Sequence, residues 1–186
     1  MPRTADHDLR RGQVSDALLR VIARAGFAEA SMAAIAAEAG VSVGLIQRYF
    51  STKDELLEFA FGCLTDRTFQ RLDTAWGERR EGEDIADTVY RMLETMLPLD
   101  EERFAEALVW VAFLAGTLPA HPALSLHAAA MRQMHEALGA ETSHVEAVLL
   151  TSVVDGLILD MVTNPADVTP ELATRGLRLA VDRVFR

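Results

Sequence analysis

The chain has 186 residues, of which half are apolar and a quarter are charged, and its formal net charge is −10. This length fits one domain or two smaller ones, and the composition excludes a disordered or low-complexity chain. No apolar run is long enough to cross a membrane, and the polar first twelve residues do not resemble a secretory signal. The single cysteine, Cys63, excludes a disulfide framework and a zinc site built on paired thiolates. We therefore expect a soluble cytoplasmic protein.

Apolar residues recur at helical spacing along the whole sequence, and no strand-like alternation of useful length interrupts them. Ser31, Ser42 and Thr52 are suited to cap helices, while Gly26 and Gly40 are suited to end them. We therefore expect an all-α fold of about nine helices. Their predicted ranges are 14–25, 32–39, 43–50, 53–76, 85–97, 100–118, 123–138, 142–163 and 170–185.

Two of the short predicted helices have the spacing of a helix-turn-helix unit. Ala36 is small where the helices would pack closely, and Gly40 can adopt the left-handed conformation of the turn. Ile35, Val41 and Ile46 would complete a small core between them. The second helix is then free to present outward the residues Ser42, Val43, Gly44, Leu45, Gln47 and Arg48. A short helix exposed in this way fits the major groove of DNA.

The charge distribution permits this interpretation despite the acidic total. Residues 1–60 contain seven basic and eight acidic residues, whereas residues 61–186 contain eleven and twenty. The acidity therefore lies almost wholly in the second part, and the first part is close enough to neutral to approach a polyanion.

The run IAAEAGVSVGLIQRYFSTKDELL, from Ile35 to Leu57, resembles the N-terminal domain of TetR-family transcriptional regulators. The similarity covers residues 10–60. Weaker similarity at Leu97–Arg103, Trp110 and Val154–Leu157 points to the branch of the choline-responsive repressor of betaine synthesis. The resemblance implies a three-helix DNA-binding domain, residues 1–55, and a helical effector-binding and dimerisation domain, residues 56–186. It also implies a repressor that a small-molecule effector releases from a palindromic operator.

The family pattern assigns DNA-binding roles to several residues. Tyr49 and Lys53 lie where phosphate contacts are expected, and Lys53 stands at a helix N-terminus, which also favours an anion. Gln47 would read a base edge, with Val43, Gly44 and Leu45 beside it. The complete candidate set is Ser31, Ser42, Val43, Gly44, Leu45, Gln47, Arg48, Tyr49 and Lys53. Arg10 and Arg11 precede the predicted first helix and would either contact DNA or form a solvated arm.

Other functions receive less support from the sequence. Gly40–Gly44 matches the G-x-S-x-G motif of acyl-transfer enzymes, but that motif requires a preceding strand, and here a helix is predicted. The five histidines lack metal-ligand spacing, and Cys63 fits a buried apolar position better than a redox sensor. We expect no catalytic residues, no metal and no cofactor. The rival classes are an all-α enzyme and a helical adaptor that binds no DNA.

An effector cavity is expected among the middle helices, because residues 107–118 are apolar on nearly every side. A cationic effector would suit aromatic faces there. The candidate lining residues are Tyr90, Trp110, Phe113, His127 and Met131. Asp155 is a sixth candidate, since a carboxylate in an apolar helix must be paired, exposed or functional. Pairing with Arg175 or Arg178 is the preferred interpretation, and counter-charge to a ligand is the alternative.

The last two predicted helices suggest a homodimer. Their apolar positions cover too much of the helix circumference for burial on one side only, which favours a symmetric four-helix interface between two copies. The candidate interface residues are Val153, Leu157, Leu177, Val181 and Val184, with Leu172 on the same two-helix face. The expected partners are therefore an operator in double-stranded DNA, a small-molecule effector and a second copy of the chain, and no membrane.

Overall fold

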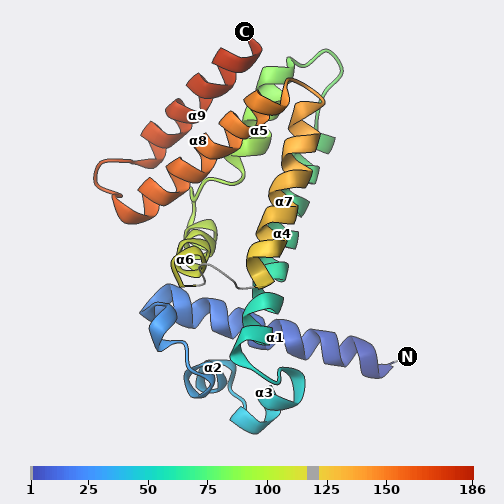
Figure 1. Ribbon diagram of the computed structural model, residues 1–186, viewed down its shortest axis with the longest axis vertical. Coiled ribbons are helices and arrows are strands. Elements are labelled where there is room, and N and C mark those ends of the chain that lie inside the picture. The colour runs from blue at the N-terminus through green and yellow to red at the C-terminus, as the bar shows by residue number, and fades with distance from the viewer. Residues whose placement is uncertain (1, 117–121) are drawn as a thin grey trace. The chain divides into compact units, whose positions relative to one another are not determined.

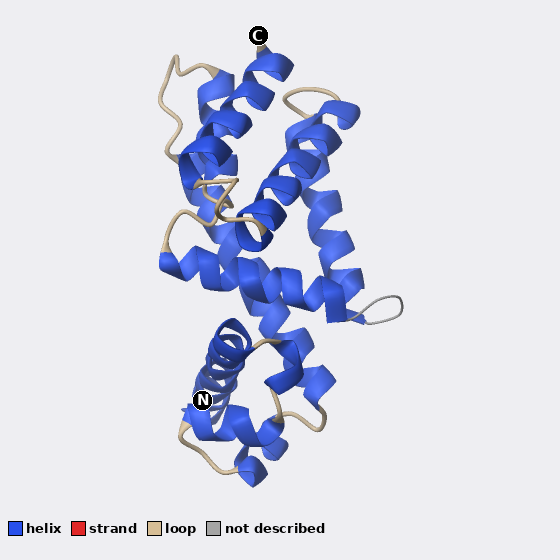
Figure 2. Cartoon of the chain, turned by 90° about the vertical axis from the view of Figure 1, so that its left-hand side faces the viewer, coloured by secondary structure: helices blue, strands red, loops and turns tan. Residues whose placement is uncertain are grey.

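The computed structural model describes the backbone of residues 2–116 and 122–186, and the side chains of residues 7, 9–112, 125 and 127–186. These residues form nine α-helices and one short 3-10 helix, and the part of the chain described contains no strand (Figures 1 and 2). The elements are α1 Pro2–Ala25, η1 Phe27–Glu29, α2 Met32–Ala39, α3 Val43–Tyr49, α4 Lys53–Gly77, α5 Ile85–Glu94, α6 Glu101–Gly116, α7 Pro122–Gly139, α8 His144–Thr163 and α9 Pro170–Phe185. The predicted all-α fold class is confirmed.

Two helix boundaries differ from the prediction by more than two residues. Helix α1 begins at Pro2, because a proline suits the first turn of a helix and no breaker follows it until Gly26. Helix α5 ends at Glu94, not at Leu97. The next N–H groups donate to carbonyls three residues back, up to Leu97 N to Glu94 O at 3.1 Å, and the residue before Pro98 is disfavoured in a helix. The predicted end of the sixth helix, residues 117–118, lies outside the described residues.

The chain divides into two compact units. The first comprises Met1–Leu64 with Leu108–Leu126, and the second comprises Thr65–Ala107 with His127–Arg186. This grouping by compactness differs from the division into 1–55 and 56–186, which remains a prediction about function.

The first unit has its core where α1, α2, α3 and the start of α4 meet. Leu18, Ile35, Ile46, Phe50 and Leu56 are all completely buried there. Ile35 and Ile46 come from the two short helices, as the helix-turn-helix spacing predicts, and partly buried Val41 packs against them. Burying a side chain of this size contributes about 1.5–3 kcal/mol, so these contacts fix α2 and α3 on α1.

The second unit contains α5, α8 and α9 packed together, and α8 and α9 run side by side in opposite directions (Figure 1). Val89 of α5, Leu150 of α8 and Leu177 of α9 are completely buried. Ion pairs also connect α9 to the start of α5, since Arg178 Nη1 lies 2.7 Å from Asp87 Oδ1 and Arg186 Nη2 lies 3.4 Å from Asp84 Oδ2. The last helix is thereby tied to the unit at several points along its length.

Candidate functional site

The turn between α2 and α3 has the conformation that the sequence predicts. Ser31 caps α2 by accepting a hydrogen bond from Ala34 N at 3.2 Å, and Ser42 caps α3 by accepting one from Leu45 N at 3.2 Å. Gly40 has φ 67° and ψ 31°, the left-handed region that glycine enters without a Cβ penalty. Ser31 and Ser42 are thus both exposed residues with a capping role, and their contact with DNA stays a prediction.

Helix α3 has one buried side and one solvent-facing side. Ile46 is completely buried, and Phe50, directly after the helix, is buried as well. On the other side Gly44, Gln47 and Arg48 are exposed. Val43 and Leu45 are half-buried at the edge of this face. The structure therefore brings the predicted base-reading residues together on a short, fixed helix.

Tyr49 lies at the end of the same helix and contacts the long first helix. Its half-buried ring packs edge-to-face against His7, with the ring centroids 4.9 Å apart. No signal in the sequence marks His7, because the residues around it are expected to form a non-helical arm.

Arg10 and Arg11 lie within α1 and do not precede it, so that part of the prediction is wrong. Arg11 stacks over the rings of Phe50 and Phe59, at 4.8 and 4.3 Å from the centroids, and its Nη2 lies 3.9 Å from Glu55 Oε1. Its guanidinium is engaged inside the unit and does not form a solvated arm. Arg10 is exposed and donates to Gln13 Oε1 at 3.1 Å.

Lys53, the only lysine in the sequence, is the first residue of α4. Its Nζ lies 3.5 Å from the Phe27 carbonyl oxygen and 4.7 Å from the centroid of the Phe27 ring. The carbonyl and the ring hold the ammonium group at the N-terminus of the helix, where the backbone dipole also favours an anion. Thr52 caps this helix by accepting from Glu55 N at 3.1 Å, whereas the Glu55 carboxylate accepts from Ser51 N at 2.7 Å, one residue earlier than in a standard capping box.

Glu38 stabilises the helix-turn-helix unit in a way that the sequence analysis missed. Its two carboxylate oxygens accept from Arg20 Nε and Arg24 Nη1 of α1, each at 2.8 Å. Hydrogen bonds from Arg20 and then Arg24 hold the pKa of Glu38 below its usual value. The i, i+4 spacing of the two arginines was the available signal, because it places both on one side of α1.

The six candidate effector residues are divided between the two units. Trp110 belongs to the first unit and packs against Phe61 there. Phe113 lies in α6, and its side chain is outside the described residues. Tyr90 belongs to the second unit, where the Arg178 guanidinium lies 4.1 Å from its ring centroid and its hydroxyl donates to Glu94 at 2.5 Å. Burial and the Glu94 carboxylate raise the pKa of Tyr90 to about 12.

The other three candidates share the pair of helices α7 and α8. His135 Nε2 lies 2.9 Å from Thr151 Oγ1, which joins these two antiparallel helices. Met131 is one turn before His135, and Asp155 is one turn after Thr151, so both continue the side on which α7 and α8 meet. His127 is one further turn along α7, and burial lowers its pKa.

Asp155 does not form the expected ion pair with the last helix. Arg178 pairs instead with Asp87 at 2.7 Å and Asp182 at 3.6 Å, and no ion pair joins Arg175 to Asp155 among the described residues. Burial raises the pKa of Asp155 to about 6, with no compensating cation. The preferred pairing with the last helix is therefore wrong. Asp155 is half-buried, and counter-charge to a ligand stays a prediction.

The structure also changes the expected dimer face. Leu177 and Val181 are completely buried within the protomer, and Leu157 Cδ2 lies 3.7 Å from the position of a Cβ on Gly176, which places it between α8 and α9. Val153 and Val184 are half-buried. Leu177 and Val181 are therefore not free to meet another chain. A place for Val153, Leu157 and Val184 in the interface stays a prediction. The large apolar side chains that remain exposed on the two helices are Val145, Val148, Leu149, Leu159, Leu172 and Leu179.

Two further structural findings concern the other classes of function. Gly40–Gly44 connects two helices, so the acyl-transfer motif lacks the strand that it needs. In the part of the chain that is described, no helix combines the length and the apolar character required to cross a bilayer, and no three metal-ligating side chains gather together.

Comparisons with known proteins agree with this geometry. The family "Bacterial regulatory proteins, tetR family" matches residues 15–60, and the family "BetI-type transcriptional repressor, C-terminal" matches residues 85–186. The regulator BetI of Ectopseudomonas mendocina is 32% identical over 172 residues, which cover 86% of this chain and 85% of that protein. The regulator PksA of Bacillus subtilis is 38% identical over 122 residues, which cover 62% of this chain and only 55% of PksA.

A crystal structure of a transcriptional regulator from Rhodococcus sp. has the same fold, with a TM-score of 0.85 at 33% identity, over 94% of this chain and 95% of that one. The exposed recognition helix, the capped turn before it and these matches lead to one assignment. The chain belongs to the TetR family of DNA-binding transcriptional regulators, in the branch with a BetI-type C-terminal domain.

Proposed function

We propose that this regulator is a homodimeric repressor that binds a palindromic operator and leaves it when a small-molecule effector binds. The observation that carries the proposal is the two-sided helix α3. Ile46 anchors it in the core, while Gln47 and Arg48 remain exposed on a fixed backbone. A helix held in this way is already ordered, so it can enter the major groove without a further loss of conformational entropy.

Recognition and anchoring fall to different residues in this proposal. Gln47 can form two hydrogen bonds to an adenine edge, and the half-buried Val43 and Leu45 can pack against a thymine methyl group. Tyr49 and Lys53 flank this face and would contact phosphates, which fixes the position of α3 without reading sequence. The same core holds all of these residues, so we expect them to approach DNA together in one fixed arrangement.

The proposed dimer uses the exposed apolar side chains of α8 and α9. Val145, Leu149 and Leu159 recur at helical spacing on α8, and Leu172 and Leu179 lie seven residues apart on α9. Two antiparallel helices with such a face can pair with their own copy in a four-helix arrangement. The symmetry of that dimer requires half-sites about 34–36 Å apart, or a multiple of this distance.

The proposed effector is an organic cation that interacts with Asp155. This carboxylate is largely buried, has no ion-pair partner among the described residues, and has a pKa raised to about 6 by burial. A cation placed beside it would compensate that burial, and Met131 and His127 lie along the same side of the two helices. To remove most of the protein from DNA, the effector must favour the released state by a few kcal/mol.

A gel shift on the DNA beside the gene of this protein tests the proposal. We expect a complex of the wild type with that DNA and a loss of sequence preference in Gln47→Ala, with non-specific affinity preserved. Gln133→Ala, an exposed glutamine on α7, is the matched control and should leave the preference unchanged. A uniform loss of affinity in Gln47→Ala would reassign Gln47 to the DNA backbone, and no complex with any sequence would favour a helical adaptor.

The effector is tested with choline as the probe cation. We expect choline to dissociate the complex of the wild type with DNA. The Asp155→Asn variant should bind DNA normally, but its dissociation should need a choline concentration at least about tenfold higher. Asp160→Asn, an exposed carboxylate on the same helix, is the control. An unchanged response of Asp155→Asn would remove Asp155 from the effector site.

A further inference from the structure

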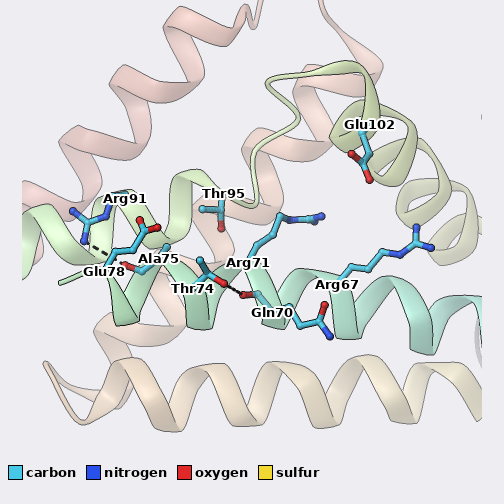
Figure 3. Close-up of a pocket in the computed structure, with 9 residues that line it drawn as sticks. All are labelled: Arg67, Gln70, Arg71, Thr74, Ala75, Glu78, Arg91, Thr95 and Glu102. Atoms are coloured by element: carbon cyan, nitrogen blue, oxygen red, sulfur yellow. Dashed lines mark hydrogen bonds between the residues drawn. The ribbon is translucent and has the colours of Figure 1, made fainter.

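A polar groove of about 520 Å³ lies in the second unit, between α4, α5 and the start of α6 (Figure 3). Two of its arginines already have carboxylate partners within the chain. Arg71 donates to Glu106 at 2.6 Å, and Arg91 pairs with Glu83. The charges of the groove therefore select no ligand, and the contact that bears on function lies in the first unit, beside the recognition helix.

This contact joins the beginning of α1 to the end of α3. The ring of His7 packs edge-to-face against the ring of Tyr49, with the ring planes at 64° to each other. His7 is exposed, whereas Tyr49 is half-buried and also packs against the core of the first unit. Aromatic pairs with this geometry are favourable beyond the area that they bury, so the contact favours one orientation of the tyrosine ring.

His7 reaches this position because α1 is helical from Pro2 onward. Among the described residues of α1, burial in the core begins only at Val14, and Leu9 is 61% exposed. The first turns of α1 therefore lie outside the core. A contact made there contributes little to the stability of the core, and its main effect falls on the side chain that it touches, Tyr49.

The backbone of Tyr49 is fixed independently of His7. Phe50 N donates to Ile46 O at 2.9 Å, and both of these side chains are completely buried. Only the side-chain rotations of Tyr49 remain to be fixed. Its hydroxyl makes no hydrogen bond to a described residue, so it is available to an external acceptor. A side chain that is ordered before binding loses less entropy when it binds.

We propose that His7 is a positioning residue for DNA binding, whose ring holds Tyr49 in the orientation that presents its hydroxyl to a DNA phosphate. The inference rests on the proposed function, in which Tyr49 contacts a phosphate. Because a phosphate contact reads no sequence, His7 affects the affinity for every duplex and leaves the base preference unchanged.

Fluorescence anisotropy of the full chain with a DNA duplex of arbitrary sequence at low salt tests the inference. His7→Ala removes the ring and should weaken binding about two- to tenfold, which is the effect of one aromatic pair. His7→Phe keeps a ring but removes the imidazole N–H groups and any charge on them, and should restore the affinity of the wild type. His144→Ala is the control, because His144 is an exposed histidine of the second unit that also packs edge-to-face, against His135.

The Tyr49→Phe background separates positioning from a merely structural role. The hydroxyl is absent there, so His7→Ala should weaken binding no further, and the melting temperature should be the same with and without His7. An equal loss of affinity in both backgrounds would overturn the inference. A His7→Phe variant as weak as His7→Ala would also overturn it, because His7 would then contact DNA itself.

The same measurements distinguish this inference from the proposed function. A wild type that binds the duplex and is unaffected by His7→Ala would refute the role of His7 alone. A wild type that binds no duplex would refute the proposed function together with it.

Discussion

The pH dependence of stability provides a direct test of the buried charge at Asp155. Burial raises its pKa to about 6 from an ordinary value of 3.8. This difference corresponds to a penalty on the order of 3 kcal/mol for the ionised carboxylate in the folded state. Asp155→Asn removes the charge and keeps the shape, so it should stabilise each protomer by up to about that amount at pH 8.

The size of the stabilisation by Asp155→Asn changes predictably with pH. Below pH about 4 the carboxyl is protonated in both the folded and the unfolded chain, so the variant and the wild type should differ little. Between pH 4 and 6 the unfolded chain loses the Asp155 proton while the folded chain keeps it, so the wild type loses stability as the pH rises, and above pH 6 the full penalty applies. The advantage of Asp155→Asn should therefore grow from near zero to a plateau as the pH rises.

Thermal unfolding of both proteins between pH 4 and 8 measures this advantage. For a chain of this length about 3 kcal/mol corresponds to an increase of roughly 6–12 °C in melting temperature. Asp160→Asn, on the exposed side of the same helix, is the matched control. A flat difference for Asp155→Asn, or a variant less stable than the wild type at pH 8, would refute the argument that this carboxylate is buried without a partner.

Three further predictions concern the DNA contact, the turn and the dimer. Lys53→Ala should weaken binding to every DNA sequence and reduce the slope of log affinity against log salt by about 1, and an unchanged slope would exclude a phosphate contact. Gly40→Ala should cost about 1–2 kcal/mol in urea unfolding because φ there is 67°, whereas Gly44→Ala, in a helical position with open space around it, should be neutral or stabilising. Leu179→Asp should yield folded monomers in sedimentation, whereas Leu177→Asp, at a fully buried position, should unfold the chain; dimers of the Leu179 variant would place the interface elsewhere.

Local signals in the sequence predicted the recognition unit well. The capping serines, the glycine in the turn and the apolar positions of the two short helices act over a few residues, so their spacing alone contains the information. The family resemblance of residues 35–57 adds the roles of Tyr49 and Lys53, which spacing alone does not supply. The structure confirms the conformation of the turn and the burial of Ile46, while the contacts with DNA stay predictions.

The effector and dimer residues were harder to predict, because they depend on which side of a helix faces a neighbour. Helix α8 is apolar on most of its circumference, so its sequence does not distinguish the side that packs on α9 from the side that stays exposed. Leu177 and Leu179 show the difficulty on α9: both are leucines, yet one is completely buried and the other is 57% exposed. Asp155 shows the same difficulty for charged residues. From the sequence alone Arg178 could pair with either Asp155 or Asp87, and only the packing of the helices decides between them.

The sequence by itself determined the class of the protein: an all-α regulator of the TetR family whose short, capped third helix is exposed on a small core. Those features follow from interactions between residues close together in the chain. Only the tertiary structure decided that Arg11 stacks over Phe50 and Phe59 and that Glu38 joins two helices. It also decided that Asp155 is half-buried with no ion pair to a described residue, and that the exposed apolar face of α8 and α9 contains Leu149 and Leu179. Each of these depends on contacts between residues distant in sequence, and helical periodicity cannot choose among such contacts until the helices are packed.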